Sequence, residues 1–158
     1  MSELKKYKMF INGEWVDSES KKTFKSLNPE NNEPWAEAPE ANEKDVDKAV
    51  KSAQKAFEGK WPNLFPRERA KYLKAIAEQL RKNAELLGKI ETIDTGKLFK
   101  ETKTQANYIA EYYDYYAGLA DKVEGTVLPI DKANMQVITT RVPIGVVAAI
   151  IPWNSQML

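Results

Sequence analysis

Residues 143–154 read PIGVVAAIIPWN, and they give the clearest prediction of the architecture. The apolar run from Gly145 to Ile151 is bounded by Pro143 and Pro152, which is typical of a strand buried on both faces. Strands of that kind belong to parallel sheets, so the chain is predicted to be α/β. Parallel neighbours need crossovers of about a dozen residues or more, and few residues follow Ile151. We therefore expect the sheet to be cut short soon after this strand.

Short strands open the chain. Residues 9–11 and 14–16 flank Asn12-Gly13, the dipeptide that best suits a tight hairpin turn. Residues 23–27 could add a further strand, whereas residues 30–42 are rich in Asn, Pro and Glu and predict an extended loop. A second hairpin is predicted later, with its strands at residues 126–130 and 135–142.

A helix is predicted over residues 42–59. Asn42 is a good N-cap, and Asp45 can return the hydrogen bond three residues later. Gly59 is expected to end the helix. The apolar residues recur at helical spacing and predict a buried stripe formed by Val46, Ala49, Val50, Ala53 and Phe57.

Further helices follow, three to four in all. A helix that begins near Pro66 can break at Asn83, leaving a shorter helix that ends at Gly96. The next covers residues 98–120 and carries five of the seven tyrosines of the chain, within residues 108–116. These tyrosines form either an aromatic binding face or a core stripe whose hydroxyls reach the surface. The helical period favours the core stripe.

The composition excludes several classes of protein. The 24 basic and 23 acidic residues leave a net charge of +1, which provides no electrostatic footprint for nucleic acid or an anionic membrane. The chain contains no Cys and no His, so cysteine or histidine chemistry would have to come from other residues. No targeting signal is recognised, and the longest apolar stretch is too short to cross a bilayer. A cytoplasmic location is therefore expected.

Asn154 is the candidate catalytic residue, because it follows the carboxyl end of the predicted buried strand. Open α/β sheets bind their ligands at that end. The turn lacks the glycines of an ordinary dinucleotide fingerprint, but it carries a side-chain amide that could stabilise an oxyanion. The alternative is that Asn154 only shapes the turn after Pro152, and the residues by themselves favour that simpler role.

An ordered series of motifs resembles the aldehyde dehydrogenase superfamily, whose members oxidise aldehydes with NAD or NADP. The matching segments are residues 10–16 (FINGEWV), 28–29 (NP), 45–50 (DVDKAV), 94–97 (DTGK), 116–122 (YAGLADK), 143–147 (PIGVV) and 151–154 (IPWN). Each motif alone is weak evidence, but their order along nearly the whole chain is highly specific.

The resemblance implies how the chain is organised. Residues 1–122 would be the amino-terminal part of the cofactor-binding domain, with the short hairpin and the helices. Residues 123–143 would form the hairpin of an oligomerisation arm. Residues 144–158 would be the first strand and turn of a parallel, Rossmann-like sheet.

The resemblance also implies roles for individual residues. Asn154 would donate its amide to the oxyanion that forms when a cysteine attacks the aldehyde, giving a thiohemiacetal. The residues implied to lie against the nicotinamide half of NAD or NADP are Ile150, Ile151, Pro152 and Trp153. A monovalent cation is implied, bound mostly through backbone oxygens, near Ser26, Leu27 and Asp94.

The chain departs from the family after Asn154. An aromatic residue, Pro and Leu are usual there, whereas this chain has Ser155, Gln156 and Met157, so the substrate class stays open. The nucleophilic Cys, the Glu base and the adenosine-binding Lys of the family have no counterparts in these residues, so the chain alone is expected to be inactive.

Two interpretations remain. The chain is part of a longer aldehyde dehydrogenase, completed by the rest of the enzyme and acting as a homodimer or homotetramer on an aldehyde. Alternatively, it is a non-catalytic remnant that serves as a structural or interaction module.

Overall fold

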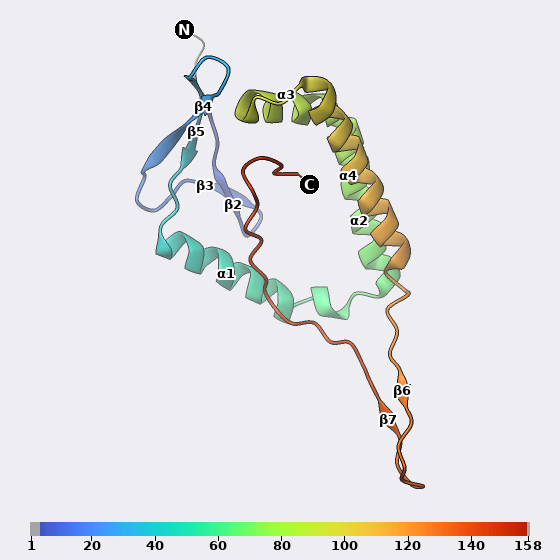
Figure 1. Ribbon diagram of the computed structural model, residues 1–158. Helices are drawn as coiled ribbons and strands as arrows, with labels where there is room; N and C mark the ends of the chain where they lie inside the picture. Colours follow the sequence, from blue (N-terminus) through green and yellow to red (C-terminus); the bar gives the residue numbers. More distant parts are fainter. Residues whose placement is uncertain (1–3, 158) are drawn as a thin grey trace.

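The computed structural model describes residues 4–157. Figure 1 shows two groups of elements, with the N-terminal strands and α1 (Glu43–Glu58) on one side and three helices on the other. A hairpin projects away from both groups, and the C-terminal segment returns from it to lie between them. The described part of the chain is thus an open arrangement and not a closed layered domain.

The predicted N-terminal hairpin is confirmed. Strand β2 (Met9–Ile11) pairs antiparallel with β3 (Glu14–Val16). The two residues between them have positive φ, 54° at Asn12 and 81° at Gly13. A tight hairpin turn of type I′ needs positive φ at both central residues, which Asn-Gly tolerates best.

A three-stranded sheet has the order β1-β5-β4. Strand β4 (Thr23–Asn28) confirms the strand predicted at residues 23–27 and pairs antiparallel with β5 (Glu33–Pro39), which also pairs in parallel with β1 (Lys5–Lys6). The prediction of a loop over residues 30–42 is therefore wrong for most of that segment. Its Pro and Asn content disfavours a strand locally, but hydrogen bonds to neighbours on both sides and the burial of Ala36 outweigh that preference.

The helices begin and end close to the predicted residues. Helix α2 (Pro66–Lys82) is separated by Asn83 from α3 (Ala84–Thr95), and α4 (Phe99–Leu119) follows. A short 3-10 helix, η1 (Trp61–Asn63), joins α1 to α2. Gly96 ends α3 with φ 77°, the left-handed conformation that glycine adopts at low cost.

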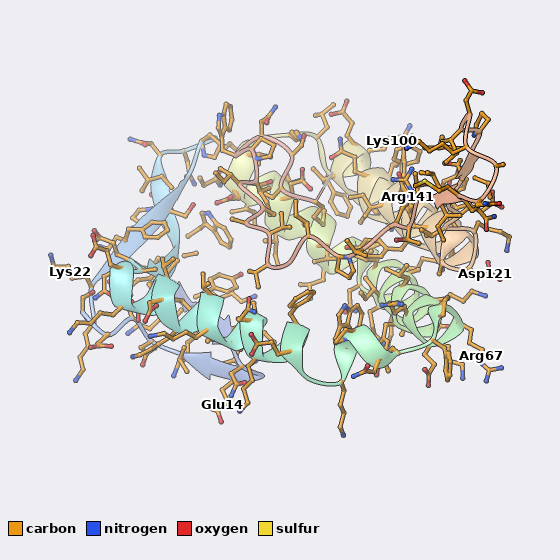
Figure 2. All side chains as sticks on the ribbon, turned by 90° about the horizontal axis from the view of Figure 1, so that it is seen from below. Glu14, Lys22, Arg67, Lys100, Asp121 and Arg141 are labelled. Carbon is orange, nitrogen blue, oxygen red and sulfur yellow. The ribbon has the colours of Figure 1, made fainter. Side chains whose placement is uncertain are left out.

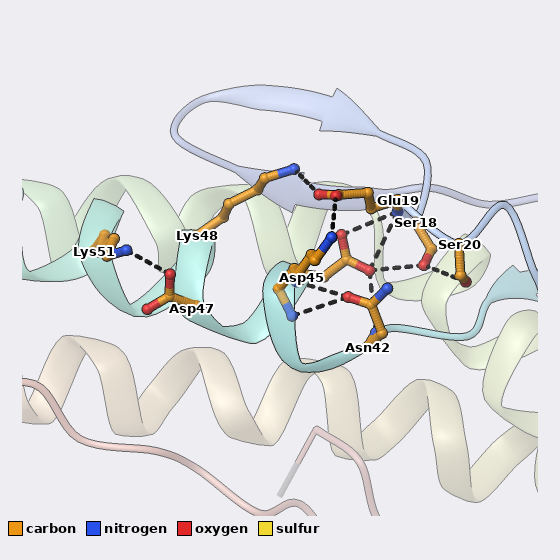
Figure 3. A network of polar contacts seen from close by, with 9 residues as sticks. Ser18, Glu19, Ser20, Asn42, Asp45, Asp47, Lys48 and Lys51 are labelled. Carbon is orange, nitrogen blue, oxygen red and sulfur yellow. Dashed lines mark hydrogen bonds and ion pairs between the residues drawn. The ribbon is translucent and has the colours of Figure 1, made fainter.

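The first turn of α1 is fixed by the polar network shown in Figure 3. The Asn42 side chain accepts from the backbone N–H groups of Lys44 and Asp45, at 2.9 and 3.1 Å. The buried Asp45 carboxylate accepts from the Ser18 hydroxyl at 2.7 Å and from the N–H of Asn42 at 3.1 Å. These hydrogen bonds hold the pKa of Asp45 below its ordinary value, and the bond from Ser18 has the largest effect. The predicted capping box is confirmed.

Helix α4 packs against both α2 and α3 through small side chains. The buried apolar residues of this helical group are Ala77, Ala84, Ala106, Ile109, Ala110 and Ala117. The tyrosines lie beside this stripe, and four of the five are exposed: Tyr108, Tyr112, Tyr115 and Tyr116. The core-stripe prediction is therefore wrong for these four, because alanines and Ile109 are the apolar residues buried in this helical group.

The apolar stripe predicted for α1 is not buried among residues 4–157. Val46 is 55% exposed and Val50 is 48% exposed. Asp45, in the first turn, is the buried residue of this helix. Its hydrogen bonds with Ser18 and Glu19 join the helix to the N-terminal segment. The helical period was predicted correctly, but the described elements leave the apolar face uncovered.

The run from residue 145 to 151 is also uncovered. It forms no regular strand, and Ile150 is 95% exposed. The prediction of a strand buried on both faces is wrong for the described residues, because such a strand needs a neighbour on each side and none of them supplies one. The hairpin before it is confirmed but shorter than predicted, with β6 (Val127–Leu128) paired to β7 (Val137–Ile138).

Charged side chains of both signs are spread around the periphery. Figure 2 shows them on several different parts of the chain. The labelled examples are Glu14, Lys22, Arg67, Lys100, Asp121 and Arg141. Within residues 4–157, no helix combines the length and the apolar character that a bilayer span needs.

Candidate active site

The predicted cofactor and catalytic residues lie together in one exposed segment near the end of the described chain. Ile151 is 57% exposed and Trp153 is 80% exposed, and the adjacent Pro152 and Asn154 are exposed as well. The side-chain hydrogen bonds that hold this segment come from Ser155 and Gln156, the two residues after Asn154. The amide of Asn154 is therefore left accessible, with its neighbours anchored.

Ser155 is anchored by Lys97, which directly follows the left-handed Gly96. The Lys97 Nζ donates to Ser155 Oγ at 2.9 Å and to Glu91 Oε1 at 3.1 Å. The Glu91 side chain is only 5% exposed, and that of Lys97 is 24% exposed. A buried carboxylate on α3 thus holds the ammonium group that holds Ser155.

Gln156 is anchored by Asp94, which connects three parts of the chain. Asp94 Oδ2 accepts from Gln156 Nε2 at 3.2 Å. Its Oδ1 accepts from the Ser26 hydroxyl at 2.5 Å and from Trp35 Nε1 at 3.2 Å. Trp35 is not among the predicted site residues, because it lies in the segment predicted to be a loop. Its indole N–H, which needs a polar partner when buried, is the one feature of the sequence that indicates this contact.

The residues predicted to bind a monovalent cation are thus partly brought together. Ser26 and Asp94 are in contact, and Leu27 is adjacent to Ser26 on β4. Both carboxylate oxygens of Asp94 already accept hydrogen bonds from the protein. The described residues contain no group of three or more His, Cys, Asp or Glu side chains placed to hold a metal. The cation site stays a prediction that depends on backbone oxygens.

A cavity of about 500 Å³ lies beside the end of this segment. Its lining is apolar and aromatic, and comes from α2, α4 and the C-terminal segment: Leu73, Tyr108, Ile109, Tyr112, Tyr113, Tyr116 and Met157. Met157 is three residues from Asn154, so the cavity and the amide are close along the chain. Three of the exposed tyrosines, Tyr108, Tyr112 and Tyr116, therefore line a cavity that could receive an apolar or aromatic group, which favours the aromatic binding face over the core stripe.

Comparison with known proteins identifies relatives over almost the entire chain. The aldehyde dehydrogenase family model matches residues 15–158. The chain is 46% identical over 155 residues to (Z)-2-((N-methylformamido)methylene)-5-hydroxybutyrolactone dehydrogenase of Acinetobacter baylyi, covering 98% of this chain and 31% of that protein. It thus spans about three tenths of the length of that relative.

Solved structures share the fold as well as the sequence. A mutant aldehyde dehydrogenase from Bacillus cereus matches with a TM-score of 0.89 and 38% identity, over 95% of this chain and 31% of that one. A betaine aldehyde dehydrogenase point mutant from Staphylococcus aureus, solved in complex with NAD⁺, matches with a TM-score of 0.76 and 34% identity, over 82% of this chain and 26% of that one.

The family match covers most of the chain. The anchored turn that carries Asn154 lies inside the matched residues. This chain therefore belongs to the aldehyde dehydrogenase family.

Proposed function

We propose that the chain is the amino-terminal part of an NAD(P)-dependent aldehyde dehydrogenase that oxidises an aldehyde to a carboxylic acid. The observation that carries this proposal is the exposed amide of Asn154 on a turn whose next two residues are anchored. The similar proteins are dehydrogenases, so the alternative of a non-catalytic module gains no support from them.

Asn154 would act on the carbonyl oxygen of the substrate. When a cysteine from outside this chain adds to the aldehyde, that oxygen gains negative charge as a thiohemiacetal forms. An amide N–H aimed at the oxygen then makes a stronger hydrogen bond than it makes to the neutral aldehyde. The contribution of Asn154 would therefore be made mainly in the transition state.

Residues 150–153 would hold the nicotinamide half of NAD or NADP, which accepts a hydride from the substrate when bound. Their chemistry fits the flat face of an aromatic ring, because residues 142–154 contain no ionisable side chain and Ile150 and Trp153 present open apolar surface. Ile151 and Pro152 would exclude water from one side of the ring. The acidic and basic groups needed for the rest of the cofactor would come from elsewhere.

The tyrosine-lined cavity would receive the organic part of the aldehyde. Met157 joins the cavity to the turn, and the small Ser155 leaves space beside Asn154. The β6–β7 hairpin, which projects from the molecule in Figure 1, would contact another subunit of a homodimer or homotetramer. A monovalent cation near Ser26, Leu27 and Asp94 would stabilise the same region.

The decisive variant is Asn154→Ala in the whole enzyme that contains this chain. Loss of one oxyanion donor typically lowers kcat by about 10²–10³-fold, or roughly 3–4 kcal/mol. The dissociation constant for NAD(P) should stay within a few-fold, because that interaction is made in the ground state. Steady-state kinetics and cofactor titration measure the two quantities on the same sample.

The matched control is Asn107→Ala, which removes the same side chain from an exposed position on α4. It should leave kcat unchanged. A well-folded Asn154→Ala enzyme with near-normal turnover would show that the side chain only shapes its turn, and the proposed catalytic role would be wrong.

A further inference from the structure

Two side-chain hydrogen bonds, here called tethers, hold the two residues that follow Asn154. Ser155 is bound by Lys97 at 2.9 Å, and Gln156 is bound by Asp94 at 3.2 Å. Both anchors belong to the end of α3 and the residue after its Gly96 cap. Partners 58 and 62 residues away in sequence therefore hold consecutive residues of one turn.

The anchors are themselves held in place. Asp94 is fixed by Ser26 of β4 and Trp35 of β5, so its carboxylate joins the three-stranded sheet to α3. Lys97 is fixed by Glu91, whose side chain is 95% buried and whose Oε2 has no hydrogen-bond partner within residues 4–157. A buried carboxylate with an unsatisfied oxygen costs stability, so its presence calls for an explanation beyond packing.

The chemistry of Ser155 explains why the first tether can form. Its short side chain carries a hydroxyl oxygen that accepts the hydrogen bond from Lys97. An aromatic or aliphatic side chain at this position offers no comparable acceptor to an ammonium group. The Ser155 hydroxyl and the buried ion pair are therefore parts of one arrangement.

We propose that Glu91 and Lys97 are positioning residues for Asn154: they fix Ser155, with Asp94 and Gln156 as a second tether, and thereby hold the Asn154 amide in its donating orientation. This inference rests on the proposed role of Asn154. A catalytic group must be held within about 0.5 Å of its productive position, and a misplacement of about 1 Å can cost about 10²-fold in rate. Asn154 has little freedom to move, because the two residues that follow it are anchored.

The test uses two variants of the whole enzyme. Glu91→Gln/Lys97→Met removes the ion pair without leaving a single buried charge, and Ser155→Ala removes the acceptor while the ion pair stays intact. Each should lower kcat by about ten-fold to about a hundred-fold, with the KM for aldehyde within a few-fold. Ser155→Thr keeps the hydroxyl and should restore most of kcat. Should the double variant fold poorly, Ser155→Ala and Ser155→Thr decide the matter.

Two further readouts separate positioning from general stability. Backbone amide exchange over residues 150–157 should become faster in both tether variants, with little change in α2 and α4. In an Asn154→Ala background, the tether variants should cause no further loss of kcat, because the group that they position is absent. The matched control, Glu85→Gln/Lys89→Met, removes an exposed ion pair on α3 and should change neither readout.

The outcomes distinguish this inference from the proposed function. Loss of kcat in Asn154→Ala, with normal kcat or unchanged exchange in the tether variants, would overturn the positioning role alone. The positioning role would also be overturned if the tether variants lowered kcat as much in the Asn154→Ala background as in the wild type. The tethers and Asn154 would then contribute independently to kcat. Normal turnover in Asn154→Ala would instead overturn the catalytic role, and the positioning role with it.

Discussion

Asp45 illustrates how one residue links the N-terminal segment to a helix. It belongs to the first turn of α1, yet it accepts hydrogen bonds from Ser18 and from the backbone N–H of Glu19. Its ionised form is the one that these donors favour, so the pKa of Asp45 is lowered relative to the unfolded chain. A lowered carboxylate pKa makes the folded state depend on pH.

We predict that this contribution to stability is complete at neutral pH and is lost as the pH falls below about 4, the ordinary pKa of Asp. The sign follows because the unfolded chain binds the proton at a higher pH than the folded chain does. Asp45→Asn should unfold at a lower temperature than the wild type at pH 7, and the difference should shrink toward pH 3. Thermal unfolding followed by circular dichroism across this range provides the measurement.

The control for this prediction is Asp47→Asn, on the exposed part of the same helix, where the carboxylate pairs with Lys51. An exposed pair of this kind contributes little. A difference between wild type and Asp45→Asn that stayed constant from pH 7 to pH 3 would contradict the electrostatic explanation.

At the scale of elements, the contact between α3 and α4 depends on a glycine. A Cβ atom added to Gly88 would lie 2.8 Å from the backbone N of Lys103 and 2.9 Å from its Cα. The adjacent Thr102 is fully buried and donates from its hydroxyl to the Gly88 carbonyl at 2.9 Å. Close backbone approach, and not conformational freedom, is the reason for glycine at this position.

Gly88→Ala should therefore destabilise the protein by about 1–3 kcal/mol, the usual cost of overpacking. Gly118→Ala on α4 is the matched substitution, since an added Cβ there meets no atom within 4 Å. It should be neutral or stabilise the protein by up to about 1 kcal/mol, because alanine has the higher helix propensity. Equal melting temperatures for the two variants would show that the helices can separate at no cost.

The whole molecule exposes more surface than a compact protein of its size. Its accessible surface is 12848 Å² for a mass of 18.0 kDa, whereas a compact monomer of that mass exposes about 8,000 Å². Part of the excess is apolar, as on the stripe of α1 and along residues 144–151. Apolar surface of this extent promotes association with other chains or segments.

We predict that the 158-residue chain expressed by itself self-associates at tens of micromolar. Light scattering at increasing protein concentration should show a rising mean mass. Val46→Glu/Val50→Lys places an i,i+4 ion pair on the apolar stripe of α1 and should reduce the association. A clean monomer over the full concentration range would contradict this prediction.

The control variant is Gln54→Glu/Glu58→Lys, which places the same pair on an exposed polar part of α1. It should leave the association unchanged. An equal reduction by both variants would indicate a general effect of surface charge instead of covered apolar surface.

Features whose causes lie within a few residues can be predicted directly from the sequence. Asn12-Gly13 sets a turn by its own φ preferences, Asn42 caps the helix that follows it, and Gly96 ends another. Helical spacing located the helices, and the order of the motifs identified the family, without any knowledge of contacts. These signals act locally, so the rest of the fold does not have to be known.

Which residues meet and which faces are covered depends on the folded arrangement of distant segments. Strand β5 forms because it has hydrogen-bonding neighbours on both sides, although its composition predicts a loop. Residues 145–151 have a composition typical of a buried strand but remain exposed, because no described segment pairs with them. The contact of Lys97 with Ser155 joins residues 58 positions apart. Hydrogen bonding and burial depend on such distant partners, which a single sequence does not bring together.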